Sequence, residues 1–372
     1  MNERELQKRL SVAATREEKL SLLDTIADEF LEREKYADAI LCYSRALRLE
    51  TRPNVKAYLK GQIGICNYNL GNDREARQHL LKAASLFNPL QPEFMPDMCG
   101  FVYFHLGSLF EYQGNVKKAL EARRACEKYI DSQEKDTKWM LYSGISRNLE
   151  ALGKYDEAIE YSQKAIQVLS DNDPGLTYLY ESMASNHMSL KQYPEAVKYF
   201  SKVLELDPDF EHKDEIYLKL ADCYRNLTND RMAIESYNKI LELKQITDKR
   251  EDLAWLYARI AHSYFRLEQY EQSLSVTQEA LRKKSKSSAD KAELRGYLTN
   301  NYYELGHYLE AAREGEKTLK IVRRFRNDSS FYFRMALSYH KLGDKKNFAK
   351  YRKLCRRMFP EDGWNKHLEK LG

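Results

Sequence analysis

The chain has 372 residues, of which 43% are hydrophobic and 31% are charged, with only 15 Gly and 8 Pro. This composition favours an all-helical protein, and no apolar run approaches the roughly 18 residues that a membrane-spanning helix needs. The charged start, MNERELQKRL, lacks the apolar core of a secretory signal, so we expect a cytoplasmic protein.

The net charge of +5 hides an asymmetry along the chain. Residues 282–372 hold 23 Lys and Arg against 11 Asp and Glu, whereas the preceding residues hold 38 against 45. The six cysteines are scattered and form no CxxC pair, so the sequence predicts neither a disulfide framework nor a cysteine metal site. We expect these thiols to be small buried apolar groups.

Taken in order, the chain begins with a short leading helix predicted over residues 2–14. Thr15 stands three residues before Glu18, the arrangement of a capping box at a helix start. Nine similar segments follow. Each is aligned on one position, called the anchor here, and successive anchors are 37 to 43 residues apart. The anchors are Ala39, Ala76, Ala119, Ala158, Ala196, Ala233, Ser273, Ala311 and Phe348.

Three further positions repeat with the anchor. The residue twelve before it is small in all nine segments, and the residues thirteen and seventeen before it are always apolar. These offsets place the residues on one face of a helix. Each segment is therefore predicted to be two antiparallel helices, A and then B, that meet where small residues allow close approach.

Breakers mark the ends of these helices. Five of the turns between A and B carry a glycine, at positions 71, 114, 153, 306 and 343. Asp173-Pro174 and Asp207-Pro208 separate segments, and Asp248 with Glu251 repeats the capping-box spacing. The proline-rich link 88–96 is either a hinge or a packed loop, and we expect the packed loop. Residues 362–371 are predicted to form a closing helix.

Residues 152–169, LGKYDEAIEYSQKAIQVL, resemble the second half of a tetratricopeptide repeat, a unit of about 34 residues. The resemblance extends to all nine segments and implies a right-handed α-solenoid with capping helices at both ends, forming a single domain over residues 1–372. It also implies that the A helices line a concave groove. Stacking is obligatory in such arrays because one helix pair cannot bury its own apolar face.

The resemblance assigns the groove-facing positions to 18, 15, 11, 8 and 7 residues before each anchor. Aromatic rings recur there among Arg, Asn and Glu, which suits an extended peptide or a partner helix. The alternative is that several rings pad the packing between repeats. The predicted contact residues are Tyr58, Tyr68, Asn69, Phe101, Phe104, Tyr112, Arg147, Tyr178, Glu181, Trp255, His262, Arg266, Asn300, Tyr303 and Lys341.

Charge along the predicted groove is also uneven. Asp24, Asp28 and Glu32 stand in the first repeat, whereas Arg266, His340 and Lys341 stand in the last ones. Such a field could orient a charged ligand, although a solvated helical face explains it equally well. One subclass of the family binds chaperone tails through a Lys and an Asn four residues apart. The equivalent pairs here, such as Asp24 with Asp28, are different, which argues against that function.

No motif for catalysis or phosphate binding, such as GxxxxGK[ST], HExxH or GxSxG, stands where a site would need it. We therefore expect no enzyme, no cofactor, no metal and no small-molecule substrate. The leading hypothesis is a protein-protein interaction scaffold or adaptor.

Two alternatives stay open. One is a sensor similar to the bacterial peptide-responsive regulators built from such repeats, although the first repeat begins too near the N-terminus to leave room for an effector head in this sequence. The other is an assembly factor whose basic C-terminal third binds nucleic acid or an anionic membrane.

Overall fold

The computed structural model describes residues 3–129, 135–247, 252–283, 287–322, 329–361 and 363–371, and these contain helices and no strand. Two short helices stand at the ends, α1 (Glu3–Leu10) and α20 (Trp364–Lys370). The A helices are α2 (Arg16–Leu31), α4 (Pro53–Asn69), α6 (Pro96–Tyr112), α8 (Lys135–Ala151), α10 (Gly175–Ser189), α12 (Lys213–Asn226), α14 (Ala254–Arg266), α16 (Ser288–Glu304) and α18 (Ser329–Lys341).

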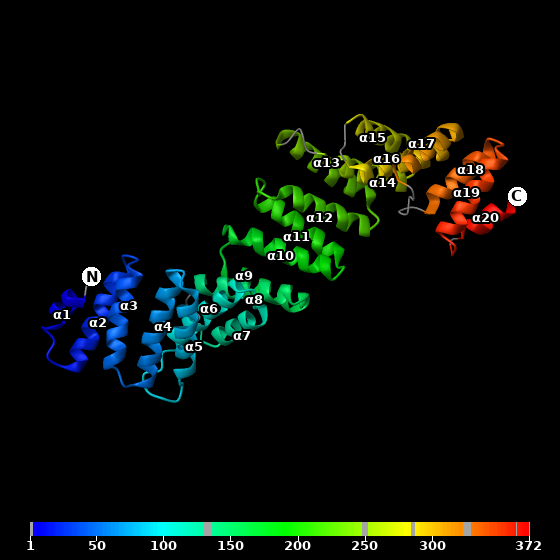
Figure 1. Ribbon diagram of the computed structural model, residues 1–372. Coiled ribbons are helices and arrows are strands. Elements are labelled where there is room, and N and C mark those ends of the chain that lie inside the picture. The colour runs from blue at the N-terminus through cyan, green and yellow to red at the C-terminus, as the bar shows by residue number, and fades with distance from the viewer. Residues whose placement is uncertain are drawn as a thin grey trace. The chain divides into compact units, whose positions relative to one another are not determined.

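The B helices are α3 (Tyr36–Leu49), α5 (Asp73–Leu86), α7 (Val116–Glu127), α9 (Tyr155–Val168), α11 (Tyr193–Leu206), α13 (Asp230–Thr247), α15 (Tyr270–Arg282), α17 (Tyr308–Ile321) and α19 (Lys345–Met358). Nine A–B pairs between two capping helices confirm the predicted all-α solenoid of helix-turn-helix repeats (Figure 1).

The anchors lie in the core of the helix pairs. Each of the nine is buried, and the eight small ones have no exposed surface. The polar anchor, Ser273, is satisfied because its hydroxyl donates to the Ala261 carbonyl at 2.8 Å and accepts from Asn301. A polar group buried here without such partners would destabilise the fold.

The turns between A and B share one backbone conformation. The residue five before each anchor has a positive φ, between 54° and 81°. Five repeats supply the predicted glycines, whereas the other four use Glu34, Lys191, Thr228 and Glu268. A side chain in the left-handed region costs about 1–2 kcal/mol, so the helix packing on both sides of these four turns compensates for local strain.

The proline-rich link is a packed loop, as predicted. Asn54, which is buried on α4, donates through its Nδ2 to the carbonyls of Asn88, Gln91 and Pro92 at 2.9 to 3.3 Å. Its Oδ1 accepts from the Asn88 amide at 2.9 Å. One side chain thus replaces the regular hydrogen bonds that the loop backbone lacks.

The predicted capping box and the predicted burial of the cysteines are both confirmed. Thr15 and Glu18 form the capping box at α2, with both reciprocal hydrogen bonds. All six cysteines are buried free thiols. Asp248 and Glu251 lie outside the described residues. No helix in the described part of the chain is long and apolar enough to cross a membrane.

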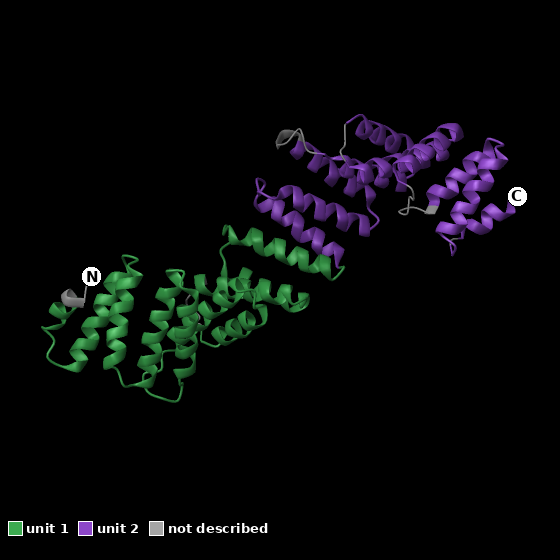
Figure 2. Cartoon of the chain, viewed as in Figure 1, with its two compact units in different colours: residues 1–191 green, residues 192–372 purple. Residues whose placement is uncertain are grey.

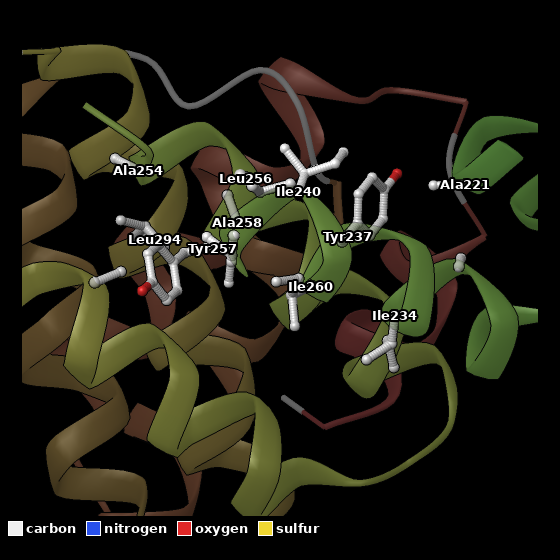
Figure 3. Packing of buried hydrophobic residues seen from close by; sticks show 13 residues of the cluster. Ala221, Ile234, Tyr237, Ile240, Ala254, Leu256, Tyr257, Ala258, Ile260 and Leu294 are labelled. Atoms are coloured by element: carbon white, nitrogen blue, oxygen red, sulfur yellow. The ribbon is translucent and has the colours of Figure 1, made fainter. Parts of the chain in front are cut away.

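The described chain divides into two compact units, Met1–Lys191 and Gln192–Gly372 (Figure 2). The boundary falls in the turn of the fifth repeat, between α10 and α11. The single domain over residues 1–372 stays a prediction, because each unit is described by itself. In the second unit, one core cluster joins α13 and α14, with Tyr237, Ile240, Leu256 and Ile260 gathered along the two helices and Leu294 of α16 beside them (Figure 3).

Candidate functional site

A hollow of about 380 Å³ opens on the A-helix side of the first unit, between α8 and α10. We call it the α8–α10 pocket. The lining residues on α8 are Trp139, Ser143, Ser146, Arg147 and Glu150, those on α10 are Gly175, Tyr178, Leu179 and Ser182, and α9 adds Ser162. Arg147 and Tyr178 are two of the predicted contact residues, so the structure brings these two together.

The pocket exists because a small residue stands where other repeats bury a large one. Ser162 lies four residues after its anchor, where Tyr43, Phe200 and Tyr237 are fully buried in their own repeats. Ser162 is also buried, and its hydroxyl lies 2.7 Å from that of Ser146, which donates to the Ala158 carbonyl at 2.8 Å. The missing ring leaves unfilled space above a hydrogen-bonded pair of serines.

The walls and the rim of the pocket differ in chemistry. Trp139, Tyr178 and Leu179 provide apolar surface, and Tyr178 is 65% exposed. Arg147, whose side chain is 66% exposed, and Glu150 bring opposite charges to the rim. Glu150 accepts a hydrogen bond from the Ser182 hydroxyl at 3.2 Å. This arrangement can hold a flat or aliphatic side chain while a donor and an acceptor bind the backbone that carries it.

A buried ion pair lies beside this rim. Arg123 of α7 has a side chain only 6% exposed, and it donates to Glu111 of α6 at 2.5 Å and to the Asn148 amide oxygen of α8 at 2.5 Å. Glu111 also lies 3.4 Å from Arg147. One carboxylate therefore serves two guanidinium groups, which holds Arg147 at the pocket without fully neutralising it.

Two glycines make room for the buried guanidinium. A Cβ on Gly107 would lie 2.7 Å from the Arg123 Cγ, and one on Gly144 would lie 2.6 Å from its Nε. Both glycines are inside helices, where glycine is unfavourable relative to alanine by about 1 kcal/mol. The close approach of Arg123 explains why these positions lack a side chain.

A second group of predicted residues meets on α4 and α6. The ring of Tyr68 lies 5.2 Å from that of His105, which also contacts the ring of Phe104 at 5.7 Å. The His105 Nδ1 is buried without a hydrogen-bond partner. Burial lowers the pKa of His105 to about 4, so this imidazole is neutral in the folded protein at neutral pH.

The remaining predicted residues of the first unit divide by exposure. Tyr112 is 81% exposed and Asn69 is exposed at the end of α4. Tyr58 donates to Asp24 at 3.1 Å and packs against the core, and burial raises the pKa of the Asp24 carboxyl. Phe101 and Glu181 are half-buried. Tyr58 therefore behaves as the alternative expected, as a ring that pads the packing.

In the second unit, most predicted residues are engaged with the protein itself. Trp255 packs against the core cluster of α13 and α14, and the ring of Tyr303 contacts that of Tyr308 at 5.7 Å. The His262 Nδ1 lies 2.8 Å from the Tyr297 hydroxyl. Arg266 forms an ion pair with Asp230 at 3.3 Å.

Asn300 and Lys341 differ most in solvent exposure. Asn300 is only 2% exposed, so it cannot offer its side chain to a ligand in this conformation, and its place in the predicted contact set conflicts with its burial. Lys341 is exposed at the end of α18. The charge gradient from the first repeat to the last stays a prediction, because its two ends belong to different units.

Sequence reasoning missed Arg123, Ser162 and Trp139. The signals were present for the first two, because a charged and a small residue stand where four other repeats bury a large apolar one. Within the described residues, no group of three or more His, Cys, Asp or Glu could hold a metal ion. Of the basic C-terminal segments, Lys284 to Lys286 and Arg323 to Arg326 lie outside the described residues.

Comparison with known proteins places these helix pairs in a family. Sequence profiles described as tetratricopeptide repeat match residues 25–90, 141–168, 177–210 and 214–247. The chain contains tetratricopeptide repeats over these segments. Members of this family generally bind protein or peptide partners. The matched segment 177–210 covers α11 and most of α10.

Among curated proteins, the photosystem I assembly protein Ycf3 of Rippkaea orientalis is 28% identical over 138 residues. The match covers 37% of this chain and 60% of that protein, which is less than two thirds of its length.

Among solved structures, the apo form of RapI is 14% identical with a TM-score of 0.48, over 95% of this chain and 98% of that one. YrrB, described as a tetratricopeptide repeat protein with an unusual peptide-binding site, is 17% identical with a TM-score of 0.42, over 57% and 99%. None of these likenesses says what this chain binds.

Proposed function

We propose that the protein is a non-catalytic interaction scaffold that holds an extended peptide or a partner helix against its A helices, with the α8–α10 pocket as the anchor point. The observation that carries the proposal is the pocket itself, in which aromatic walls, a buried serine floor and a charged rim converge on one hollow. A single side chain buried in such a hollow contributes a large share of the binding energy of an interface.

The rim gives the ligand its direction. Arg147 can donate to a peptide carbonyl, whereas Glu150 can accept from a peptide amide three residues further along the same helix face. A backbone that bridges these two groups runs along α8 and presents its side chain to Trp139 and Tyr178. The ion pair of Arg123 with Glu111 supports this step, because it fixes the carboxylate that holds Arg147.

The test is an affinity selection of peptides from a random display library on the whole chain. Selected peptides are then measured by calorimetry on Tyr178→Ala, which removes one wall, and on Ser143→Leu, which fills the pocket with the residue that repeat six carries as Leu218. We expect at least about tenfold weaker binding in both. Leu90→Ala, which changes a loop residue that is 94% exposed, is the matched control. The proposal is refuted if both pocket variants bind the selected peptides as tightly as the wild type does.

The basic surface of α19 favours a second candidate function, binding to an anionic partner. This helix carries seven Lys and Arg and no acidic residue. Lys346, Lys350, Lys353 and Arg357 share one face by their spacing of four, seven and eleven residues. Retention on heparin that falls steeply with salt, and falls further in Lys346→Glu with Lys353→Glu, would support this function. Absence of retention at low salt would exclude it.

A further inference from the structure

A second hollow of the first unit shares no lining residue with the α8–α10 pocket. It encloses about 600 Å³ between the B helices α5 and α7, with α6 as its floor. We call it the α5–α7 groove. Its floor consists of Tyr103, Leu106 and Phe110, the last two of which are buried. α6 packs against both wall helices.

Departures from the repeat pattern create this groove. Ala84 stands eight residues after its anchor, where six other repeats carry a leucine or isoleucine, for example Leu47 and Ile166. The smaller side chain leaves a hollow beside the floor residues. Ala122 has the same effect on the opposite wall, because the equivalent position is a tyrosine in three other repeats.

One rim residue departs from the pattern because it is apolar where the other repeats are polar. Leu81 is 47% exposed, five residues after its anchor. The equivalent residue is polar or charged in all eight other repeats, for example Ser44, Gln163 and Lys353. A leucine that faces water beside an apolar hollow, at a position where every other repeat is polar, points to an occupant that covers it.

The charges at the rim indicate the chemistry of the occupant. Arg77 on the α5 wall donates to the neutral Gln113 at 3.2 Å, and the Lys118 ammonium on the α7 wall lies 5.7 Å from the Phe110 ring. Neither cation forms an ion pair with any residue that the structure describes. Glu121 is the one acid among the lining residues. Two cations on facing walls attract carboxylates on both sides of an occupant.

We propose that the α5–α7 groove is a second docking site, which takes an acidic amphipathic helix of a partner protein. The apolar face of that helix covers Leu81, Leu106 and Phe110, and its flanking carboxylates pair with Arg77 and Lys118. The wall helix α5 has 14 residues and is therefore about 21 Å long, which matches three to four turns of a helix. This site lies on the B helices, so the protein can hold two partners at once.

The test uses a defined probe, a fluorescein-labelled peptide of about 15 residues designed as an amphipathic helix, with leucines at helical spacing and glutamates along both edges. Fluorescence anisotropy measures its binding to the full chain. We expect binding that weakens about tenfold or more in Ala84→Leu, which restores the residue of the other repeats and should leave the fold intact. The double variant Arg77→Glu with Lys118→Glu should also lose the probe.

Controls separate this site from the one proposed on the A helices. Tyr178→Ala should leave the affinity for the probe unchanged, and a probe with every glutamate replaced by lysine should bind the wild type poorly and the charge-reversed variant well. The proposal is overturned if the wild type does not bind the acidic probe, if Ala84→Leu binds it equally well, or if Tyr178→Ala removes the binding. It is also overturned as a partner site if sedimentation shows self-association that Ala84→Leu abolishes.

Discussion

The ion pair between Arg123 and Glu111 predicts that Gly144→Ala destabilises the wild type but stabilises a variant that lacks Arg123. In the wild type, Gly144→Ala would bring a Cβ within 2.6 Å of the Arg123 Nε, and the hydrogen bonds to Glu111 and Asn148 prevent the guanidinium from moving away. We expect a destabilisation of about 1–2 kcal/mol. In an Arg123→Ala background the same change no longer meets the guanidinium and gains helix propensity, so it should stabilise by about 1 kcal/mol.

The background variant has a cost of its own. Removing one partner of a buried ion pair costs about 3–5 kcal/mol. Glu111 is 26% exposed, and Arg147 remains near it, so water and that cation recover part of the loss. We therefore expect Arg123→Ala to destabilise the first unit by about 2–3 kcal/mol, with hydrogen exchange increasing in α6, α7 and α8.

Thermal unfolding followed by circular dichroism gives the four combinations, and hydrogen exchange shows where the change lies. Gly64→Ala is the matched control. Its Cβ would lie 2.7 Å from the Leu80 Cγ, so it should destabilise to the same extent in both backgrounds. If Gly144→Ala changes the stability in the same direction in both backgrounds, Arg123 is not the reason for the glycine, and the account of the pocket rim is wrong.

Three further predictions concern the pH dependence, the turns and the link. The pKa of His105 is about 4 when folded and about 6.5 when unfolded, so stability is lost as the pH falls from 6.5 to 4. His105→Phe should lessen this loss, measured as the urea midpoint at both pH values. Thr228→Gly should stabilise by about 1 kcal/mol in thermal unfolding, since a β-branched residue has a φ of 57° there, and Glu268→Gly should stabilise by a similar amount. No gain in either would contradict turn strain. Asn54→Ala should cost about 2–3 kcal/mol and expose link amides to hydrogen exchange, whereas unchanged exchange would contradict its bracing role.

The sequence was sufficient to predict the frame of the fold because that frame repeats. A small residue stands at the anchor in eight of the nine copies and twelve residues before it in all nine, where the A and B helices pack together, so the copies repeat one rule many times. The turns show the limit of this reasoning. Glycine predicted five of them, whereas Glu34 and Thr228 adopt the same left-handed conformation without any residue-type signal.

The candidate site was harder to predict because it depends on exceptions to that rule. Offsets placed Arg147 and Tyr178 on the A-helix side, where the structure places them beside one pocket. The same offsets also selected Asn300, which is buried, because a helix position alone does not tell how closely the next helix covers it. Burial at the edge of a helix face depends on the neighbouring repeat, and the anchor spacing varies from 37 to 43 residues, so that neighbour is not placed identically in every repeat.

Both hollows of the first unit have the same physical origin, although they lie between different helices. Ser162 and Ala84 each replace a larger side chain that several other repeats carry, and each hollow is lined by an aromatic ring, Trp139 in one case and Phe110 in the other. An unfilled space in a packed interface forfeits contacts and is unfavourable for stability. Neighbouring repeats show that a larger residue fits the same frame, so the frame did not force the small one. A ligand that fills the space would restore the lost contacts on binding, which is the physical reason to seek partners at these two departures.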